Sequence, residues 1–415
     1  MVAQEIPARS AGHARSEIKG ELKREMLELA TRFEPELIAL RRHIHQHPEL
    51  SFHEQRTSEE VANRVAALGY SVRKHVGLTG VIAELDNGAG PCVALRADMD
   101  ALPIQEANTV DYRSANPGVM HACGHDAHMS MLIGAARLLM DMRTRNELPG
   151  GRIRLLFQPS EEASDHENKS GATRMIEDGA LKDVDAVFGL HVGAHLEAGK
   201  FYLRSGPMMA GSDTFTAHVL GKSSHAARPH EGIDAIVLAA HVVLACQNAV
   251  ARRISPFRQG VLTVGMMKGG TAENIIADRV TLRGTIRYFE EDVRKVLRAE
   301  LKNALNIAET LGGKVELDLR NGYPPVVNDI TMTDLAHGTV VQLFGTESIA
   351  DFEPMMGAED FALMLQEAPG AFMWLGAALD KPREHHHPEF NIDERVLVKG
   401  ASALAGIAIQ ALNAL

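Results

Sequence analysis

Hydrophobic and polar positions along the chain switch between two periods, and this predicts helices and strands in turn. Apolar residues recur at helical spacing from Glu54 to Tyr70 and stop at Gly69, a typical helix C-terminal signal. Further elements follow from the same periods: helices over 126–142 and 394–412, and buried strands over 81–85, 92–97, 152–158, 184–191 and 371–376. Alternating strands and helices predict an α/β fold, with a mixed sheet flanked by helices on both faces.

The middle of the chain has a different order of elements. Strands are predicted over 213–220, 261–267, 280–289 and 314–319, and helices over 233–252 and 291–311. This β-α-β-β-α-β order is the ferredoxin-like, split βαβ arrangement. We therefore predict an α/β domain in two parts, 25–205 and 321–415, interrupted by an inserted domain over 206–320.

Composition and charge narrow the classes of function. A chain of 415 residues suffices for two domains at about 100–200 residues each. The net charge of −11 argues against binding to nucleic acid or to an anionic membrane surface. Three cysteines indicate no disulfide framework and favour a reducing compartment. No run approaches the roughly 18 consecutive apolar residues of a membrane helix, and residues 1–24 read as a polar leader without a secretion signal. We expect a soluble cytoplasmic protein.

Polar clusters lie where predicted strands end or where a loop follows them. They are Asp98 and Asp100, the 121–126 segment, Glu161 and Glu162, His191, and the 385–387 histidine run. Each has an ordinary structural explanation: a buried cysteine beside a hydrogen-bonded histidine, a solvated glutamate pair, a core histidine or a polar loop. Carboxyl ends of strands form the ligand edge of α/β sheets, so their shared position favours one common site.

The donor types of these clusters suit divalent metals. Cysteine, histidine and carboxylate ligands together are what zinc and its first-row neighbours accept. There are more ligands than one catalytic ion needs, which favours two ions sharing a bridge. One carboxylate of the Glu161–Glu162 pair would then remain as a base. The glycine-rich run 265–270 lacks the order of a dinucleotide-binding fingerprint.

Several strings closely resemble the hippurate hydrolase, aminoacylase and auxin-conjugate hydrolase family of dinuclear metallopeptidases. They are LRADMDALPI (95–104), MHACGHD (120–126), QPSEE (158–162), GLHV (189–192), GKSSHAARPH (221–230) and GAEDF (357–361). The resemblance implies a metal-dependent hydrolase of N-acyl-amino acids, with the inserted domain serving as lid and as dimerisation surface of a homodimer. A dipeptidase or carboxypeptidase on the same scaffold is the alternative, and a non-catalytic metal-binding protein a remote one.

The resemblance also implies a role for individual residues. The metal ligands would be Cys123 as the bridge, His125, Glu162, His191 and, by a His-x-Pro-x-Phe pattern, His386 rather than His385 or His387. They would hold two divalent ions per subunit (zinc, manganese, cobalt or nickel). Glu161 would be the general base, Asp100 would orient a ligand, and His225 would stabilise the developing oxyanion. The expected substrate-binding positions are Asn274, Arg287 and Gly357, with the arginine suited to a carboxylate.

The sequence departs from the family pattern in three places. Residues 163–170 form a longer and more charged loop than usual, which we expect to border the substrate cleft. The His-x-Asp motif of the relatives reads Asp98-Met99-Asp100 here, so His125 is expected to replace the missing histidine. Ala358 stands where the family often has serine.

Overall fold

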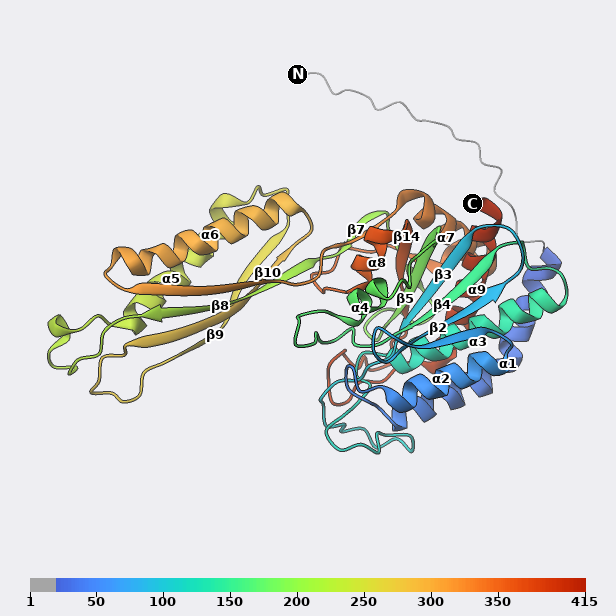
Figure 1. Ribbon diagram of the computed structural model, residues 1–415, viewed down its shortest axis with the longest axis horizontal. Coiled ribbons are helices and arrows are strands. Elements are labelled where there is room, and N and C mark those ends of the chain that lie inside the picture. The colour runs from blue at the N-terminus through green and yellow to red at the C-terminus, as the bar shows by residue number, and fades with distance from the viewer. Residues whose placement is uncertain (1–19) are drawn as a thin grey trace, which may run out of the picture.

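Eight strands form one mixed sheet in the large lobe of the molecule (Figure 1). Their order across the sheet is β1 (Ser71–Val76), β2 (Gly80–Asp86), β4 (Arg152–Gln158), β3 (Cys92–Asp98), β5 (Ala186–Gly193), β14 (Gly370–Gly376), β6 (Phe201–Tyr202) and β13 (Ile349–Ala350). The four central strands β4, β3, β5 and β14 are parallel, whereas β2 and β6 run antiparallel to them. The carboxyl ends of the central strands therefore meet at one edge.

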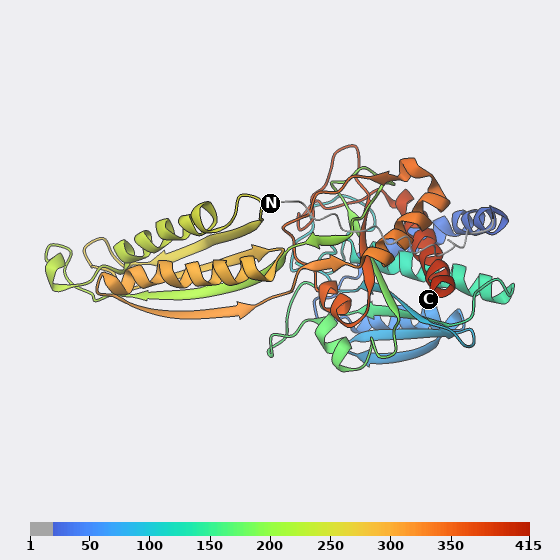
Figure 2. The same ribbon diagram turned by 90° about the horizontal axis from the view of Figure 1, so that it is seen from above.

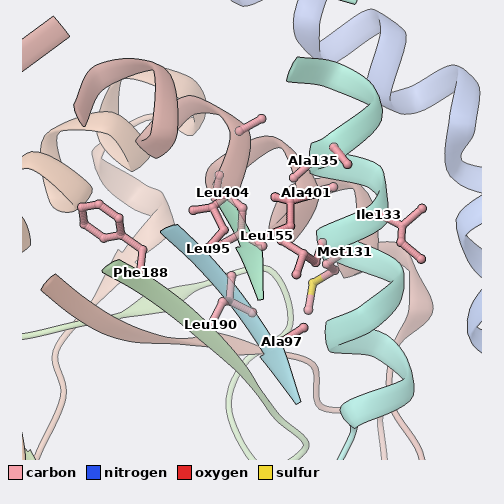
Figure 3. Close-up of a cluster of buried hydrophobic side chains, with 14 of the residues drawn as sticks. Leu95, Ala97, Met131, Ile133, Ala135, Leu155, Phe188, Leu190, Ala401 and Leu404 are labelled. Atoms are coloured by element: carbon pink, nitrogen blue, oxygen red, sulfur yellow. The ribbon is translucent and has the colours of Figure 1, made fainter. Parts of the chain in front are cut away.

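Helices cover both faces of this sheet, as the alternation of elements predicted. One face packs against α1 (Gly20–Gln46), α2 (Gln55–Ala67), α3 (His125–Thr144), α7 (Ile330–Phe344) and α9 (Leu397–Ala414). The opposite face packs against α4 (Gly171–Glu177) and α8 (Phe361–Glu367). Leu95 and Ala97 of β3 face α3 and α9 (Figure 3), whereas Ala94 belongs to the opposite core, because side chains alternate along a strand.

The small lobe is an elongated four-stranded antiparallel sheet with two helices on one face (Figures 1 and 2). Its elements follow the order β8 (Gly211–Leu220), α5 (Ala235–Asn248), β9 (Gly260–Gly269), β10 (Arg279–Tyr288), α6 (Glu291–Thr310) and β11 (Lys314–Asn321). The strand order is β11-β8-β10-β9, which leaves β9 at an edge. A two-stranded sheet of β7 (Gly206–Met209) and β12 (Val326–Asn328) lies where the chain passes between the lobes. The limits 206 and 320, and the lid and dimer roles, stay predictions.

The computed structural model describes residues 20–415. Most of the leader expected over 1–24 lies outside this range, but its last five residues are already part of α1, so that expectation was too long. α1 continues to Gln46 through an internal proline, Pro35. Its last turn brings His45 to the core beneath the polar edge of the sheet, where its ring is buried.

Two helical segments reach the length and hydropathy of a membrane span, which a search for uninterrupted apolar runs missed. In Glu394–Ala414, 83% of the most apolar 18-residue window is buried within the large lobe. In Ala235–Arg253 only 33% of the corresponding window is buried, and Ile236, Val237 and Leu244 are exposed. The first is a core helix, and the second presents an apolar face outward from the small lobe.

Candidate metal centre and active site

The carboxyl edge of the four parallel strands carries most of the predicted site residues. Asp98 ends β3, Gln158 ends β4 just before the two glutamates, and His191 lies near the end of β5. The loop before α3 adds Cys123, and His125 is the first residue of that helix. The segment after β14 adds the histidine run. Polar groups far apart in sequence converge here because parallel strands present equivalent ends at one edge.

The five predicted ligands form two groups that share Cys123. The ligand atoms of Cys123, His125 and His191 lie within 4.8 Å of one another, and so do those of Cys123, Glu162 and His386. Two atoms bound to one zinc ion, each about 2.0–2.3 Å from it, can be no more than about 4.6 Å apart. Small movements would thus bring each group onto an ion, with the sulfur of Cys123 common to both.

Two histidines have their ring nitrogens arranged as metal ligands require. Nδ1 of His125 lies 2.8 Å from the carbonyl oxygen of Asp100, and Nδ1 of His191 lies 2.8 Å from that of Val192. A neutral ring that donates through Nδ1 has its lone pair on Nε2. Nε2 of His125 is buried and has no hydrogen-bond partner, and Nε2 of His191 lies 3.5 Å from the Cys123 sulfur. The residues present therefore fit a metal-binding role.

The structure distinguishes the three consecutive histidines. Nε2 of His386 lies 3.1 Å from Oε1 of Glu162. His385 uses its Nε2 to accept a hydrogen bond from the amide of Ala194, and His387 uses its Nδ1 to accept one from the amide of Glu389 at 3.2 Å. His386 has a left-handed φ of 59°, and its amide donates to the Ala122 carbonyl. Unfavourable backbone conformations of this kind concentrate at functional sites. Among the three, only His386 joins the Cys123 groups.

Asp100 holds the backbone of the glutamate pair. Its two carboxylate oxygens accept hydrogen bonds from the amides of Glu161 (3.0 Å) and Glu162 (3.1 Å). The preceding residue, Ser160, has a left-handed φ of 43°, and its amide donates to the carboxylate of Glu54. Asp100 also presents its carbonyl to His125, so it contacts both a predicted ligand and the predicted base. Its contacts are those of a positioning residue.

The pKa of the predicted base, Glu161, is shifted in the opposite direction from that of the neighbouring ligand His191. Burial, together with the nearby carboxylates of Glu359 and Glu162, raises the pKa of Glu161 well above its ordinary value. A carboxyl group with a raised pKa is suited to exchanging protons near neutral pH. Burial lowers the pKa of His191, and neighbouring histidines lower it further, so this ring is neutral and able to bind a metal.

The Cys123 thiol and the His125 ring hold protons that a metal would displace. Burial raises the pKa of Cys123, and the carboxylates of Glu162 and Glu161 raise it further. For His125, burial opposes protonation, but Asp98 and Asp100 outweigh it and the pKa rises to about 10. Metal ligands must be deprotonated, so metal binding here releases protons.

Several functional contacts were missed from the sequence. His128 bridges Asp98, at 2.6 Å from Nδ1, and the amide of Val192, which donates to Nε2 at 2.9 Å. Arg96 donates to the other Asp98 oxygen at 2.7 Å. Asp98, a candidate oxygen ligand by sequence, is thus engaged with two side chains. An arginine inside an apolar strand and a His-x-x-His spacing at the start of α3 were the available signals.

A cavity of about 480 Å³ opens onto these groups. Its lining includes Cys123, Glu161, Glu162, His191 and His386 together with Arg287, Gly357, Tyr323 and Trp374. Two of the three predicted substrate-binding residues, Arg287 and Gly357, therefore line this cavity. Burial lowers the pKa of Arg287, and this guanidinium has no ion pair within residues 20–415. Such a cation in a cavity is a candidate site for an anionic substrate group.

The charged loop does not border this cavity, contrary to expectation. None of residues 163–170 is part of its lining. Asp165 instead accepts a hydrogen bond from Nε of Arg174 at 2.7 Å, and Lys169 pairs with Glu177 at 2.6 Å. Because both partners belong to α4, the loop is fastened beside that helix.

His225 and Asn274 lie away from the other site residues in the single chain. His225 lies in the loop that follows β8 and Asn274 in the loop that follows β9, and these loops are at the end of the small lobe that points away from the large lobe (Figure 1). The Ala226 amide donates to the Asn274 carbonyl at 3.0 Å, so the two loops are joined to each other. His225 is exposed. Within one chain, neither residue reaches the cavity.

Comparisons with known proteins agree with this geometry. The model of "Peptidase family M20/M25/M40" matches residues 94–410. N-acetyl-L-cysteine deacetylase of Bacillus subtilis is 39% identical, covering 89% of this chain and 86% of its own length. Thermostable carboxypeptidase 2 of Saccharolobus solfataricus is 40% identical, covering 91% and 95%. The Bacillus subtilis YXEP protein, described as a dinuclear metal-binding peptidase of the M20 family, superposes with a TM-score of 0.80 at 33% identity, covering 93% of this chain and 100% of its own. The chain thus belongs to peptidase family M20/M25/M40 and is a hydrolytic enzyme that acts on amides.

Proposed function

We propose that the protein hydrolyses the amide bond of N-acyl-amino acids with two divalent ions, and that Glu161 is its general base. The observation that carries this proposal is Arg287, whose guanidinium has no ion pair among the described residues and lies in the same cavity as the glutamate and the ligand groups. A guanidinium binds a carboxylate with two parallel hydrogen bonds. A carboxylate held there is a natural anchor for a substrate whose amide lies over the metal groups.

The roles of the residues follow from their positions. Two bound ions would lower the pKa of a water molecule and polarise the amide carbonyl. Glu161 takes a proton from the attacking water and delivers it to the nitrogen of the leaving amine as the C–N bond breaks. Asp100 keeps Glu161 and Glu162 in place through their amides. The products are a carboxylic acid and a free amino acid.

Completion of the site by a second copy is part of the same proposal. His225 would stabilise the developing oxyanion across a two-fold interface made by the small lobes. Two features support that interface. α5 exposes Ile236, Val237 and Leu244, and the edge strand β9 has no partner on its outer side within the described residues. Exposed apolar patches and open strand edges mark association surfaces.

Carboxypeptidase activity is the second candidate, because such substrates also carry a free carboxylate next to the scissile amide. The carboxypeptidase from Saccharolobus solfataricus makes this comparison direct. The two activities differ in what lies on the acyl side: a simple acyl group, or a peptide with its own amide and amine. A non-catalytic metal protein is disfavoured, because such a site needs no buried carboxyl like that of Glu161 beside the ligands.

The test uses metal-reconstituted protein and matched substrates. N-acetyl- and N-benzoyl-amino acids should be cleaved in preference to dipeptides, and the corresponding C-terminal carboxamides should be poor substrates. Arg287→Met should lower kcat/KM for the free acids by roughly 10- to 100-fold, the usual value of a hydrogen bond to a charged group. It should change the carboxamides little. Equal turnover of acids and carboxamides by the wild type would refute carboxylate recognition, and preference for dipeptides would favour the carboxypeptidase.

A further inference from the structure

Tyr323 links the passage between the lobes to the predicted base. It lies on the segment that returns from β11 to β12, and its side chain lines the cavity. Its hydroxyl donates a hydrogen bond of 2.9 Å to the main-chain oxygen of Glu161. Since the Glu161 amide donates to Asp100, both polar groups of this residue's backbone are held by side chains.

The segment around Tyr323 is itself fixed to the strand that enters the small lobe. The Ser212 amide donates to the Tyr323 carbonyl at 2.9 Å, and the Gly322 amide donates to the Ser212 carbonyl at 3.0 Å. A Cβ atom at position 322 would lie 2.4 Å from the Ser212 oxygen, closer than real contacts allow. The entering and returning segments are therefore held against each other, and Tyr323 is held with them.

The charged loop 163–170 also contacts Tyr323 and the segment that carries it. Asn168 donates to the Asn321 carbonyl at 3.4 Å. Burial and the carboxylates of Asp360 and Glu161 raise the pKa of Tyr323, against a hydrogen bond from Ser164 that lowers it. The hydroxyl therefore stays protonated and remains a donor to Glu161. The loop, fastened to α4 by its ion pairs, thus contacts the passage between the lobes and not the substrate cavity.

We propose that Tyr323 is a positioning residue for Glu161, braced by the 163–170 loop, so that the base keeps its orientation in the cavity. This rests on the proposed role of Glu161. Tyr323 acts through the backbone of the base, because its hydroxyl proton is already donated to the Glu161 carbonyl. The 163–170 loop then helps to orient Glu161, and the residues that line the cavity determine substrate preference.

The experiment removes one hydroxyl and uses a matched control. Tyr323→Phe should lower kcat roughly 10-fold or more, since small misplacements of catalytic groups are costly. KM and metal content should stay at wild-type values. Tyr70→Phe is the control, because the Tyr70 hydroxyl also donates 2.9 Å to a buried carbonyl, that of Ala136, away from the site. It should lower the midpoint of thermal unfolding without changing kcat. An unchanged kcat in Tyr323→Phe would overturn the proposal, and so would a parallel loss of metal.

A double-mutant cycle shows whether Tyr323 acts through Glu161. In the Glu161→Gln background, single-turnover measurements should find no further loss from Tyr323→Phe, because the group being positioned no longer accepts a proton. A full additional loss would mean that Tyr323 contacts the substrate directly and would refute the positioning role. Ser164→Ala should give a smaller loss of kcat than Tyr323→Phe, and an unaltered kcat there would remove the loop from the proposal. If the wild type cleaves dipeptides only, the proposed substrate class fails, while the same cycle run with a dipeptide still tests Tyr323.

Discussion

The metal-ligand edge of the large lobe and the outer end of the small lobe are built in opposite ways. At the edge, His125, His191 and their neighbours are buried and joined by short hydrogen bonds, as in the chain from Asp98 through His128 to Val192. At the outer end, His225 is exposed and lies on a loop that is hydrogen-bonded to the neighbouring 272–276 loop of its own lobe. Groups that must hold a cation are fixed before it arrives. In its proposed role, His225 would contact the substrate only after another surface covers it.

The largest expected effect separates the adjacent glutamates of the rigid edge. Glu161→Gln should lower kcat about 10²- to 10⁴-fold, the usual contribution of a general base, with metal content retained. Glu162→Gln should lose metal, because its carboxylate lies with Cys123 and His386. Steady-state kinetics and elemental analysis of both variants measure this. The reverse pattern would exchange the two roles, and one metal or none per fully active chain would refute the two-ion site.

Subunit exchange tests whether the outer end of the small lobe acts on a partner. Glu161→Ala and His225→Ala are each expected to be nearly inactive. If His225 acts across a two-fold interface, random mixing makes half the dimers mixed, and about a quarter of all sites regain both residues. Activity should recover to about that fraction, with mass-tagged chains confirming the exchange. Complete mixing without recovery would place His225 outside a partner's site.

The apolar face of α5 should be needed for dimer formation and not for metal binding in the large lobe. Leu244→Asp puts a charge on a side chain that is 67% exposed on this face, and we expect it to give monomers with low activity and wild-type metal content. Ile330→Asp is the matched control, because Ile330 is equally exposed (67%) but lies at the start of α7 on the large lobe. Light scattering coupled to gel filtration measures the mass. A dimeric Leu244→Asp protein would exclude this face.

The smallest effect is a pH dependence of metal affinity at the rigid edge. Cys123 and His125 both have raised pKa values, so each is protonated in metal-free protein near neutrality and must lose its proton to bind. Affinity should therefore rise with pH, by about tenfold per pH unit for each proton released, until the folded-state pKa values are passed. Competition with a chelator from pH 6 to 8 measures the slope. Cys92→Ser, in a buried strand, should keep the slope, whereas a flat profile in the wild type would contradict the protonation states.

The pattern of hydrophobic residues predicted most accurately those strands that are buried along almost their whole length. The runs behind β3, β4 and β5 are buried at every position but Arg152 and were found within a few residues. β1 was missed because this edge strand, Ser71–Val76, is mostly exposed and carries no alternation of apolar and polar residues. α7 was missed because its apolar residues are mixed with threonine, glycine and valine, which are poor helix formers, so its packing in the core decides its structure.

Site prediction followed a similar rule. Candidate metal ligands at strand ends could be recognised because cysteine, histidine and glutamate are residue types that bind metals. The ends of parallel strands also meet at one edge of the sheet, so these residues could be expected to lie together. His128 and Tyr323 could not, because a hydrogen bond to the amide of Val192 or to the carbonyl of Glu161 is set by tertiary distances alone. The charged loop was wrongly expected at the substrate, since its sequence does not show that its aspartate and lysine are engaged by α4.

The protonated thiol of Cys123 gives the metal-free enzyme an unexpected chemical robustness. Alkylation and peroxide oxidation attack the thiolate, and burial with two adjacent carboxylates keeps this sulfur in its thiol form. Protein stripped of its ions should therefore survive aerobic storage, with its sulfur still able to accept metal afterwards. The neighbouring carboxylates that favour cation binding at this site therefore also protect the Cys123 sulfur from oxidation.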